Sequence, residues 1–314
     1  MIELLQVSPV PPMLIERLEK EFTLHDFVNS ADPDTLLDAV GPNIRGILAS
    51  GMKGPNANLI NRLENLEIIA SFSVGFDSTD VVAAQSRGVI VTHTPDVLTG
   101  DVADLAMTFI LMAPRRIGES ERFLRAGKWL QGRMDLGTTA RGKRLGILGL
   151  GRIGKAVARR AEVFGLHIAY HDIKPMGDLP YRSYPTALEL AGASDILLVA
   201  CEGGQATRGL VDAAVLDALG PGGFLINTAR GTIIDQPALI SALGQGRIAG
   251  AALDVFDGEP TVPAELLALE NVVLTPHIAS STHETRRAMA DLVYDNLRAH
   301  FDGKPVLTPV PPQA

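Results

Sequence analysis

The feature that most constrains this fold is a regular alternation of short apolar segments with segments of helical periodicity. In the first hundred residues the apolar, strand-like segments cover residues 2–7, 23–27, 44–50, 66–74 and 89–93. Such βα units close into a parallel sheet with helices on both faces. The segments 44–50 and 66–74 are almost continuously apolar, as expected of strands that are covered on both sides. The first part of the chain is therefore predicted to be an α/β domain.

The alternation stops at Asp101 and restarts at Arg144. Residues 101–130 have helical character without an intervening strand, and residues 131–143 are predicted to form a loop. The second series of predicted strands covers residues 144–150, 167–172, 195–201, 223–230, 248–255 and 271–277. This series predicts a second parallel sheet, so we expect two α/β domains that meet near residue 98.

A last helix is predicted over residues 283–301, because apolar side chains recur there on one face. These side chains are Met289, Leu292, Val293 and Leu297. The helix follows the second sheet, and its periodicity is compatible with packing on either domain.

Composition limits the functional classes. At 314 residues the chain is long enough for two ordinary domains, and it contains 46% hydrophobic and 20% charged residues. No apolar run approaches the ~18 residues that cross a bilayer, and residues 1–10 do not resemble a signal peptide. The single cysteine, Cys201, suits a reducing compartment, and the net charge of −8 disfavours nucleic acid or an anionic membrane as a partner. We therefore expect a cytoplasmic enzyme or a soluble binding protein.

The most specific local motif is the G-x-G-x-x-G formed by Gly149, Gly151 and Gly154. It follows the predicted strand 144–150 and opens a helical segment, which is the context in which this motif binds a dinucleotide. The first glycine permits a tight turn, the second admits a pyrophosphate, and the third lets the helix pack closely on the strand. The phosphates then lie at the positive end of the helix. A plain βα turn is the alternative, and the context favours cofactor binding.

Asp172 ends the next predicted strand, where the dinucleotide-binding unit places the acidic residue that binds the ribose hydroxyls. A carboxylate there repels a 2′-phosphate, so NAD is favoured over NADP. Lys174 lies two positions further and softens this preference, which leaves NADP open. A surface aspartate at a strand end is the alternative reading.

Arg230, Glu259 and His277 fall at or just after the carboxyl ends of three predicted strands, where open α/β sheets bind ligands. A guanidinium can bind a carboxylate and polarise a keto oxygen. An imidazolium can donate a proton, and a carboxylate on its other ring nitrogen fixes the tautomer. Taken singly, each residue has an ordinary structural alternative, namely a surface ion pair, a solvated loop acid and a strand-end histidine.

Several ordered segments resemble the D-isomer-specific 2-hydroxyacid dehydrogenases. After GLGRIG come NTARGTIIDQPAL, AALDVFDGEP and NVVLTPHIASST, and the resemblance covers nearly the whole chain. The terminal segment ETRRAMADLVYDNLRAHFDGKPVLTPV is most like the glyoxylate/hydroxypyruvate reductase branch. The resemblance implies an NAD(P)-dependent oxidoreductase that reduces a small 2-keto acid, glyoxylate or hydroxypyruvate, to the D-2-hydroxy acid.

The same resemblance implies roles for individual residues. Arg230 would bind substrate, His277 would be the acid/base, and Glu259 would be its partner. SFSVGFDSTDV looks like the family's substrate loop, so the backbone amides of Val74 and Gly75 would hold the substrate carboxylate. The implied cofactor-binding residues are Gly149, Gly151, Arg152, Ile153, Gly154, Asp172, Cys201, Thr228, Ala229 and Asp254.

Two positions depart from the family pattern. NADPH-using reductases of this branch carry an arginine where this chain has Asp172-Ile173, which strengthens the expectation of NAD. The loop after the strand that ends at Cys201 normally begins with proline, but here it begins with Glu202, which puts the backbone path beside the adenine in doubt.

For the domains, the resemblance implies two Rossmann-like or flavodoxin-like parallel-sheet domains with a cleft between them. Residues 1–98 and 284–314 would form the substrate-binding domain, and residues 99–283 the NAD(P)-binding domain. A homodimer is expected through the cofactor domain, with the segment around Trp129 reaching across; Trp129 as an ordinary core residue is the alternative.

Other functional classes fit less well. No metal site is expected, since the seven histidines show no H-E-x-x-H and one cysteine cannot form a thiolate site. An NAD(H)-sensing binding protein of the same fold would keep similar site residues. A dehydrogenase for another small anion, such as formate or phosphite, is the second alternative.

Overall fold

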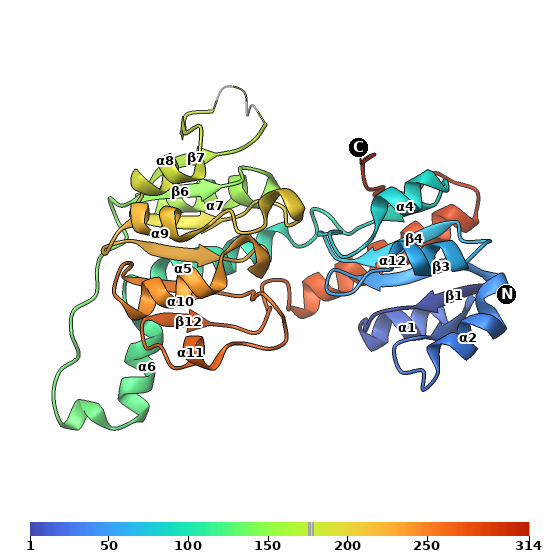
Figure 1. Cartoon of the computed structure of the whole chain (residues 1–314), viewed down its shortest axis with the longest axis horizontal. Coiled ribbons are helices and arrows are strands. Elements are labelled where there is room, and N and C mark those ends of the chain that lie inside the picture. Colours follow the sequence, from blue (N-terminus) through green and yellow to red (C-terminus); the bar gives the residue numbers. More distant parts are fainter. Residues whose placement is uncertain (175–176, 178, 314) are drawn as a thin grey trace. The chain divides into compact units, whose positions relative to one another are not determined.

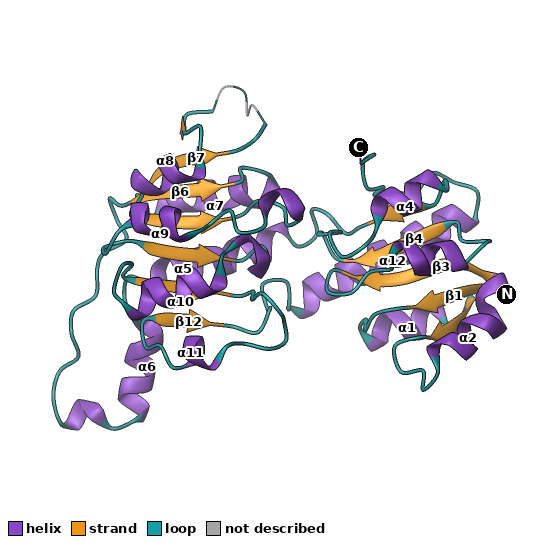
Figure 2. Cartoon of the chain, in the orientation of Figure 1, coloured by secondary structure: helices purple, strands orange, loops and turns teal. Residues whose placement is uncertain are grey.

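The computed structural model describes residues 1–174, 177 and 179–313. The chain divides into two compact units. The first unit comprises Met1–Leu98 and Thr282–Ala314, and the second comprises Thr99–Ser281. Each unit contains its own parallel sheet with helices on both faces, so both predicted sheets are confirmed (Figures 1 and 2).

Among the described residues of the first unit, five strands pair in the order β2-β1-β3-β4-β5, and every pairing is parallel. This is the flavodoxin-like order. The strands are β1 (Ile2–Gln6), β2 (Phe22–Asp26), β3 (Ile44–Ser50), β4 (Ile68–Phe72) and β5 (Ile90–Thr92).

Helices cover both faces of the first sheet because successive strand residues point to opposite sides. Leu5, Ile47 and Ile69 pack in one cluster with residues of α2, α3 and α4. On the other side, α12 contacts β4 and α1, so the structure places the terminal helix with the first sheet. The helices are α1 (Pro12–Leu18), α2 (Pro33–Val40), α3 (Ala57–Arg62), α4 (Val81–Ser86) and α12 (His283–Phe301), with a 3-10 turn η1 (Gly41–Asn43).

In the described part of the second unit, seven parallel strands pair in the order β12-β11-β10-β9-β6-β7-β8. Counted from β6, this is the dinucleotide-binding order 3-2-1-4-5-6 with one further strand. The strands are β6 (Arg144–Leu148), β7 (His167–His171), β8 (Arg182–Ser183), β9 (Ile196–Val199), β10 (Phe224–Asn227), β11 (Gly250–Leu253) and β12 (Val272–Leu274).

The two faces of the second sheet carry separate hydrophobic clusters. Leu197 and Val199 of β9 pack with α8, α9 and α10, whereas Ile196 and Leu198 pack with α5 and α7. The helices are α5 (Thr99–Met112), α6 (Ile117–Arg125), α7 (Arg152–Val163), α8 (Ala187–Gly192), α9 (Ala213–Leu219), α10 (Gln236–Gly244) and α11 (Ala264–Leu267). Short 3-10 turns are η2 (Lys128–Leu130), η3 (Gln205–Thr207) and η4 (Gly231–Ile233).

The helical region predicted over residues 101–130 is interrupted. The helix α5 ends at Met112, a turn containing Pro114 follows, and α6 begins at Ile117. Proline lacks the N–H that would continue the ladder of helix hydrogen bonds, which explains the break. None of the residues 117–125, all of which are described, is buried, and α6 with η2 projects as an arm from the second unit (Figure 1).

Among the described residues, no helix combines the length and the apolar character that crossing a membrane requires.

Candidate active site

The predicted site residues of the second unit lie at one edge of its sheet, where the parallel strands end. The glycine loop follows β6, and Asp172 follows β7. Arg230 and Asp254 come shortly after β10 and β11, and His277 follows β12. Loops from neighbouring strands converge at this edge, which is where open α/β sheets bind their ligands.

Glu259 and His277 form the most direct contact in this group. The Nδ1 atom of His277 lies 2.7 Å from Oε2 of Glu259, and the backbone N–H of Phe256 donates to Oε1 at 2.9 Å. Burial opposes the ionisation of Glu259, but these two hydrogen bonds and nearby cationic side chains, Arg230 among them, hold the pKa of this carboxyl below its usual value. Because a carboxylate only accepts, Nδ1 carries the proton, and Nε2 is the nitrogen that can exchange a proton with a ligand.

The lowered pKa of Glu259 also links the site to folding stability. A depressed pKa in the folded state means that the carboxylate stabilises the fold above the pKa of an unfolded glutamate. This contribution is lost as the pH falls through the lower folded value.

Asp254 determines the backbone path of the loop that carries His277. The side chain of Asp254 is wholly buried, and its Oδ1 accepts hydrogen bonds from Thr275 Oγ1 at 2.6 Å and from the N–H of Ile278 at 2.8 Å. Its Oδ2 accepts from the N–H of Ala279 at 2.9 Å, and its carbonyl accepts from the N–H of His277 at 2.9 Å. His277 has φ +54°, a left-handed conformation that residues other than glycine seldom adopt. The sequence did not reveal this tether, because it joins the ends of two different strands.

Arg230 lies in a turn that a buried asparagine holds in place. Asn227 is wholly buried, and its Oδ1 accepts from the N–H of Ala229 at 2.9 Å while its Nδ2 donates to the carbonyl of Arg230 at 2.8 Å. A Cβ at Gly231 would lie 1.9 Å from the carbonyl carbon of Phe256, so only glycine permits this approach of two loops. The approach brings Arg230 close enough to lower the pKa of Glu259. The sequence analysis did not predict that Asn227 holds this turn.

The glycine loop after β6 has the backbone geometry that a dinucleotide requires. Gly149 has φ +89°, and a Cβ there would lie 2.5 Å from Cα of Cys201. A Cβ at Gly154 would lie 2.3 Å from the carbonyl oxygen of Gly149. In contrast, a Cβ at Gly151 would meet nothing within 4 Å, so the loop is open in front of the first turn of α7. Gly151 is the N-cap of α7 and makes no side-chain cap, so the N–H groups of the first turn of α7 suit a pyrophosphate.

Asp172 is held beside this loop. Its Oδ2 accepts from the N–H of Leu150 at 2.8 Å, and its Oδ1 accepts from the N–H of Lys174 at 2.9 Å. Thr228, near the end of β10, has a buried Oγ1 without a hydrogen-bond partner among the described residues. An acid fixed at the end of β7, an open glycine loop and an unsatisfied buried hydroxyl together fit a dinucleotide cofactor.

The comparisons with known proteins agree with this geometry. The family model described as D-isomer specific 2-hydroxyacid dehydrogenase, NAD binding domain, matches residues 107–279. The chain belongs to the D-isomer-specific 2-hydroxyacid dehydrogenase family. It is 51% identical to glyoxylate/hydroxypyruvate reductase A of Arabidopsis thaliana over 98% of this chain and 99% of the relative. It is 42% identical to the 2-ketogluconate reductase of Gluconobacter oxydans (strain 621H) over 98% of both chains.

Solved structures of this dehydrogenase family share the fold. The NADPH-dependent glyoxylate/hydroxypyruvate reductase of Sinorhizobium meliloti in complex with NADP and malonate is 44% identical, with a TM-score of 0.92. The match covers 98% of this chain and 96% of that chain. A 2-hydroxyacid dehydrogenase from Ketogulonicigenium vulgare Y25 is 46% identical, with a TM-score of 0.91 over 99% of this chain and 98% of that chain. The protein is therefore an enzyme of this family, with a nicotinamide cofactor.

The remaining predicted cofactor residues lie along the same edge. Ile153 packs on the hydrophobic cluster under α7, while Arg152 is exposed at the start of that helix. Ala229 packs against the cluster on the opposite face of the sheet. Cys201 follows β9 and lies behind the glycine loop, and burial raises the pKa of its thiol to about 11.

Val74 and Gly75 lie in the first unit, in the loop after β4. Both are half-buried, and within the described ranges no hydrogen bond involves either backbone N–H. Two unpaired N–H groups in adjacent residues are the usual basis of a backbone anion site.

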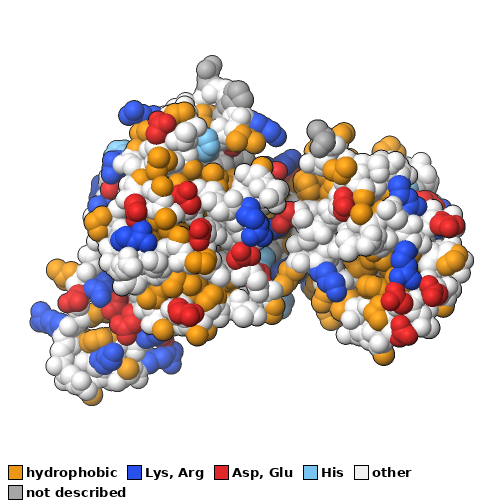
Figure 3. All heavy atoms as spheres, in the orientation of Figure 1, with side chains coloured by type: hydrophobic (Ala, Val, Ile, Leu, Met, Phe, Trp, Pro, Cys, Tyr) orange, Lys and Arg blue, Asp and Glu red, His pale blue; other side chains and the backbone are white. Residues whose placement is uncertain are grey.

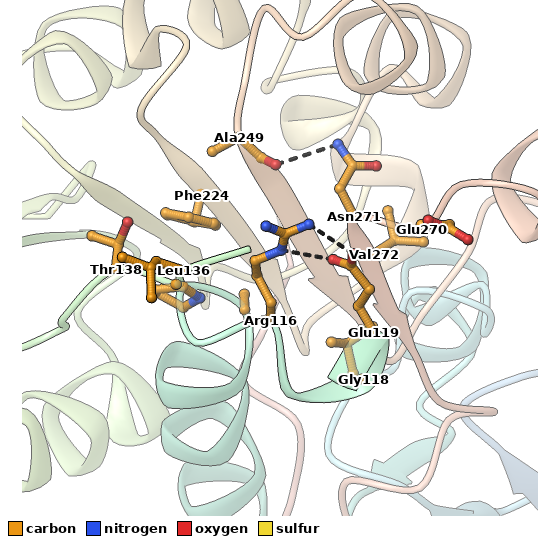
Figure 4. A pocket seen from close by; sticks show the side chains of 14 residues that line it. Arg116, Gly118, Glu119, Leu136, Thr138, Phe224, Ala249, Glu270, Asn271 and Val272 are labelled. Carbon is orange, nitrogen blue, oxygen red and sulfur yellow. Dashed lines mark hydrogen bonds and ion pairs between the residues drawn. The ribbon is translucent and has the colours of Figure 1, made fainter. Parts of the chain in front are cut away.

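The second unit also has a pocket of about 250 Å³ that is not this site. Phe224, Ala249 and Val272 line it, and they lie at the amino ends of β10, β11 and β12 (Figure 4). Its lining includes the ion pair of Arg116 with Glu119, which is joined by two hydrogen bonds of 2.7 Å. The described residues that line this pocket include none of the predicted site residues, which are at the carboxyl ends of the same strands.

The raised pKa of Cys201 should make its thiol slow to react. At pH 7.5 a thiol with a pKa of about 11 is ionised in only about 3 molecules in 10,000, and the thiolate is the reactive form. We expect Cys201 in the folded protein to react with dithiobis(nitrobenzoate) far more slowly than free cysteine, with the rate rising as the pH is raised. Protein unfolded in guanidinium is the control and should react with one equivalent of reagent. Rapid reaction of the folded protein at pH 7.5 would contradict the assignment.

Proposed function

We propose that the chain catalyses hydride transfer from a reduced nicotinamide dinucleotide to a small 2-keto acid, glyoxylate or hydroxypyruvate, giving the D-2-hydroxy acid. The observation that carries the proposal is the hydrogen-bonded pair of His277 and Glu259, with Arg230 nearby, at the sheet edge that also bears the glycine loop. The names of the related glyoxylate/hydroxypyruvate reductases support this choice of substrate.

In this proposal each charged residue has one task. The reduced nicotinamide, when bound, supplies the hydride. Arg230 binds the substrate carboxylate and polarises the keto oxygen, since a guanidinium presents several donors in one plane. His277 donates a proton from Nε2 to that oxygen as it gains negative charge. Glu259 accepts the Nδ1–H of the same ring, and so fixes the tautomer and orients the imidazole.

The first unit contributes an uncharged anion site. The N–H groups of Val74 and Gly75 would hold the substrate carboxylate, as proposed for the family's substrate loop. Backbone donors lose little conformational entropy on binding, because the loop is already ordered by its own hydrogen bonds.

NADH is the cofactor that the site favours. The fixed carboxylate of Asp172 can accept hydrogen bonds from both ribose hydroxyls, and it would lie close to a 2′-phosphate and repel it. Lys174 contacts Asp172 through its backbone N–H. The related Sinorhizobium meliloti reductase is NADPH-dependent, so the choice of cofactor needs a direct measurement.

The test of the proposed function is steady-state oxidation of NADH and of NADPH against glyoxylate, hydroxypyruvate, pyruvate, phenylpyruvate and 2-ketogluconate. We expect the highest kcat/KM for NADH with glyoxylate or hydroxypyruvate.

Asp172→Ala should lower the ratio of kcat/KM for NADH to kcat/KM for NADPH, because the charge that repels the 2′-phosphate is removed. Fast turnover with NADPH alone would leave the reaction intact and refute the cofactor assignment. Tight cofactor binding without turnover of any acid would instead identify a cofactor-sensing protein.

Variants of the charged residues test the mechanism. Arg230→Ala and His277→Ala should each lower kcat/KM by a factor of about 100 to 10,000, the usual range for a lost acid/base or anchoring group. The matched control is His167→Ala, since His167 is exposed at the amino end of β7, away from the site. Normal turnover by His277→Ala would contradict the assigned role.

We also propose that the enzyme is a homodimer in which the α6–η2 arm is covered by a second copy. Trp129 is 68% exposed and Leu130 is 95% exposed, so Trp129 is not a core residue of the described chain. Ile117, Leu124 and Leu136 add exposed apolar surface along the same segment. On the face shown in Figure 3, hydrophobic side chains lie among charged ones over this arm. Exposed apolar clusters of this kind usually mark a protein interface.

Sedimentation equilibrium tests the assembly. We expect a dimer at micromolar concentration, and Leu124→Glu together with Leu130→Glu should shift the population towards monomer because charges would enter an apolar interface. Val163→Glu, which changes an equally exposed apolar residue on α7, is the control and should leave the mass unchanged. A monomeric parent protein would refute the proposal.

A further inference from the structure

The loop that follows β4 has each of its three successive carbonyl groups bound by a donor of the protein. The carbonyl of Ser73 accepts from the N–H of Thr94 at 2.7 Å, and the carbonyl of Val74 accepts from Nδ1 of His93 at 2.9 Å. The carbonyl of Gly75 accepts from the hydroxyl of Ser73. Since a carbonyl cannot donate, the proton of the His93 ring is on Nδ1 in this contact.

These bonds determine where the neighbouring N–H groups point. In a trans peptide the C=O of one residue and the N–H of the next lie in one plane and point in opposite directions. The bond to the carbonyl of Ser73 therefore orients the N–H of Val74. In the same way, the bond from His93 to the carbonyl of Val74 orients the N–H of Gly75. Both N–H groups are directed away from the donors that hold the carbonyls.

His93 is itself held firmly. Its ring packs edge-on against Phe76, with the ring centroids 5.7 Å apart and an interplanar angle of 76°. Its backbone N–H donates to the carbonyl of Thr308 at 3.2 Å, and its carbonyl accepts from Thr308 Oγ1 at 2.6 Å.

Thr308 is anchored in turn by a buried side chain of α12. Asn296 is wholly buried, its Nδ2 donates to Thr308 Oγ1 at 2.8 Å, and its Oδ1 accepts from the N–H of Thr308 at 3.0 Å. A continuous set of hydrogen bonds therefore runs from α12 through Thr308 and His93 to the carbonyl of Val74. All of these residues belong to the first unit.

We propose that His93 is a positioning residue for the substrate carboxylate, acting through the carbonyl of Val74 on the N–H of Gly75. The inference rests on the proposed function, in which the N–H groups of Val74 and Gly75 bind that carboxylate. A histidine that only filled space beside Phe76 would be replaceable by any flat ring. The positioning role requires the Nδ1–H donor and not the ring.

Two substitutions separate these roles. His93→Phe keeps an aromatic ring beside Phe76 but removes the donor, whereas His93→Asn removes the ring and places an N–H donor at nearly the position of Nδ1. We expect His93→Phe to raise KM for the keto acid about five- to tenfold, the effect of one lost hydrogen bond, with KM for the cofactor unchanged. His93→Asn should stay within about twofold of the parent enzyme for both substrates. Equal KM values for the keto acid in the parent and His93→Phe would overturn the inference, as would a larger defect in His93→Asn than in His93→Phe.

Hydrogen exchange of the N–H of Thr94, which donates to the carbonyl of Ser73 in this loop, is measured without any keto acid and gives a readout that does not depend on turnover. Exchange should be faster in His93→Phe than in the parent, and close to the parent rate in His93→Asn, because the carbonyl of Val74 regains its donor. Unchanged exchange in His93→Phe would overturn the inference even if its KM were altered. If the parent enzyme reduces no keto acid, the proposed function fails, and the exchange rates still decide whether His93 holds the loop.

Discussion

The candidate active site depends on one buried side chain, that of Asp254. Asp254 directly follows β11, and through its two carboxyl oxygens and its carbonyl it receives four hydrogen bonds from residues 275–279, which follow β12. A left-handed backbone at a residue such as His277 costs about 1–3 kcal/mol and persists only where the surroundings determine it. Each buried hydrogen bond contributes about 0.5–1.5 kcal/mol, so four of them offset that cost. The orientation of the histidine towards Glu259 is therefore a consequence of how two neighbouring strands end.

Two glycines allow the other loops of this sheet edge to approach one another closely. At Gly231 a Cβ would overlap the backbone of Phe256, and at Gly149 it would overlap the backbone of Cys201. The first contact joins the turn of Arg230 to the loop that leads to Glu259. The second brings the glycine loop against the backbone of Cys201, which follows β9. Because both contacts are backbone against backbone, a side chain at Gly231 or Gly149 would force the two loops of each contact apart.

The parts of this structure that sequence could predict are those with a local signal. The alternation of strands and helices, the glycine loop and Asp172 were readable because period, spacing and context lie within about 30 residues. The charged residues Arg230, Glu259 and His277 were assigned roles through a family resemblance, since each had an ordinary alternative by itself. The interruption at Pro114 had a signal in the sequence, whereas β8 had none, because its two residues, Arg182 and Ser183, are polar. The tethers made by Asp254, Asn227 and His93 are fixed by side-chain orientation across strand ends, which no periodicity encodes.

Two histidines of this chain use the same atom for the same physical purpose. His277 donates its Nδ1–H to Glu259, so an acceptor fixes the ring and leaves Nε2 for proton transfer. His93 donates its Nδ1–H to the carbonyl of Val74, so the ring fixes the plane of that peptide and the direction of the Gly75 N–H. The first arrangement needs a charged partner, because the ring must gain and lose a proton. The second needs none, because the ring only has to keep its Nδ1–H on a backbone carbonyl.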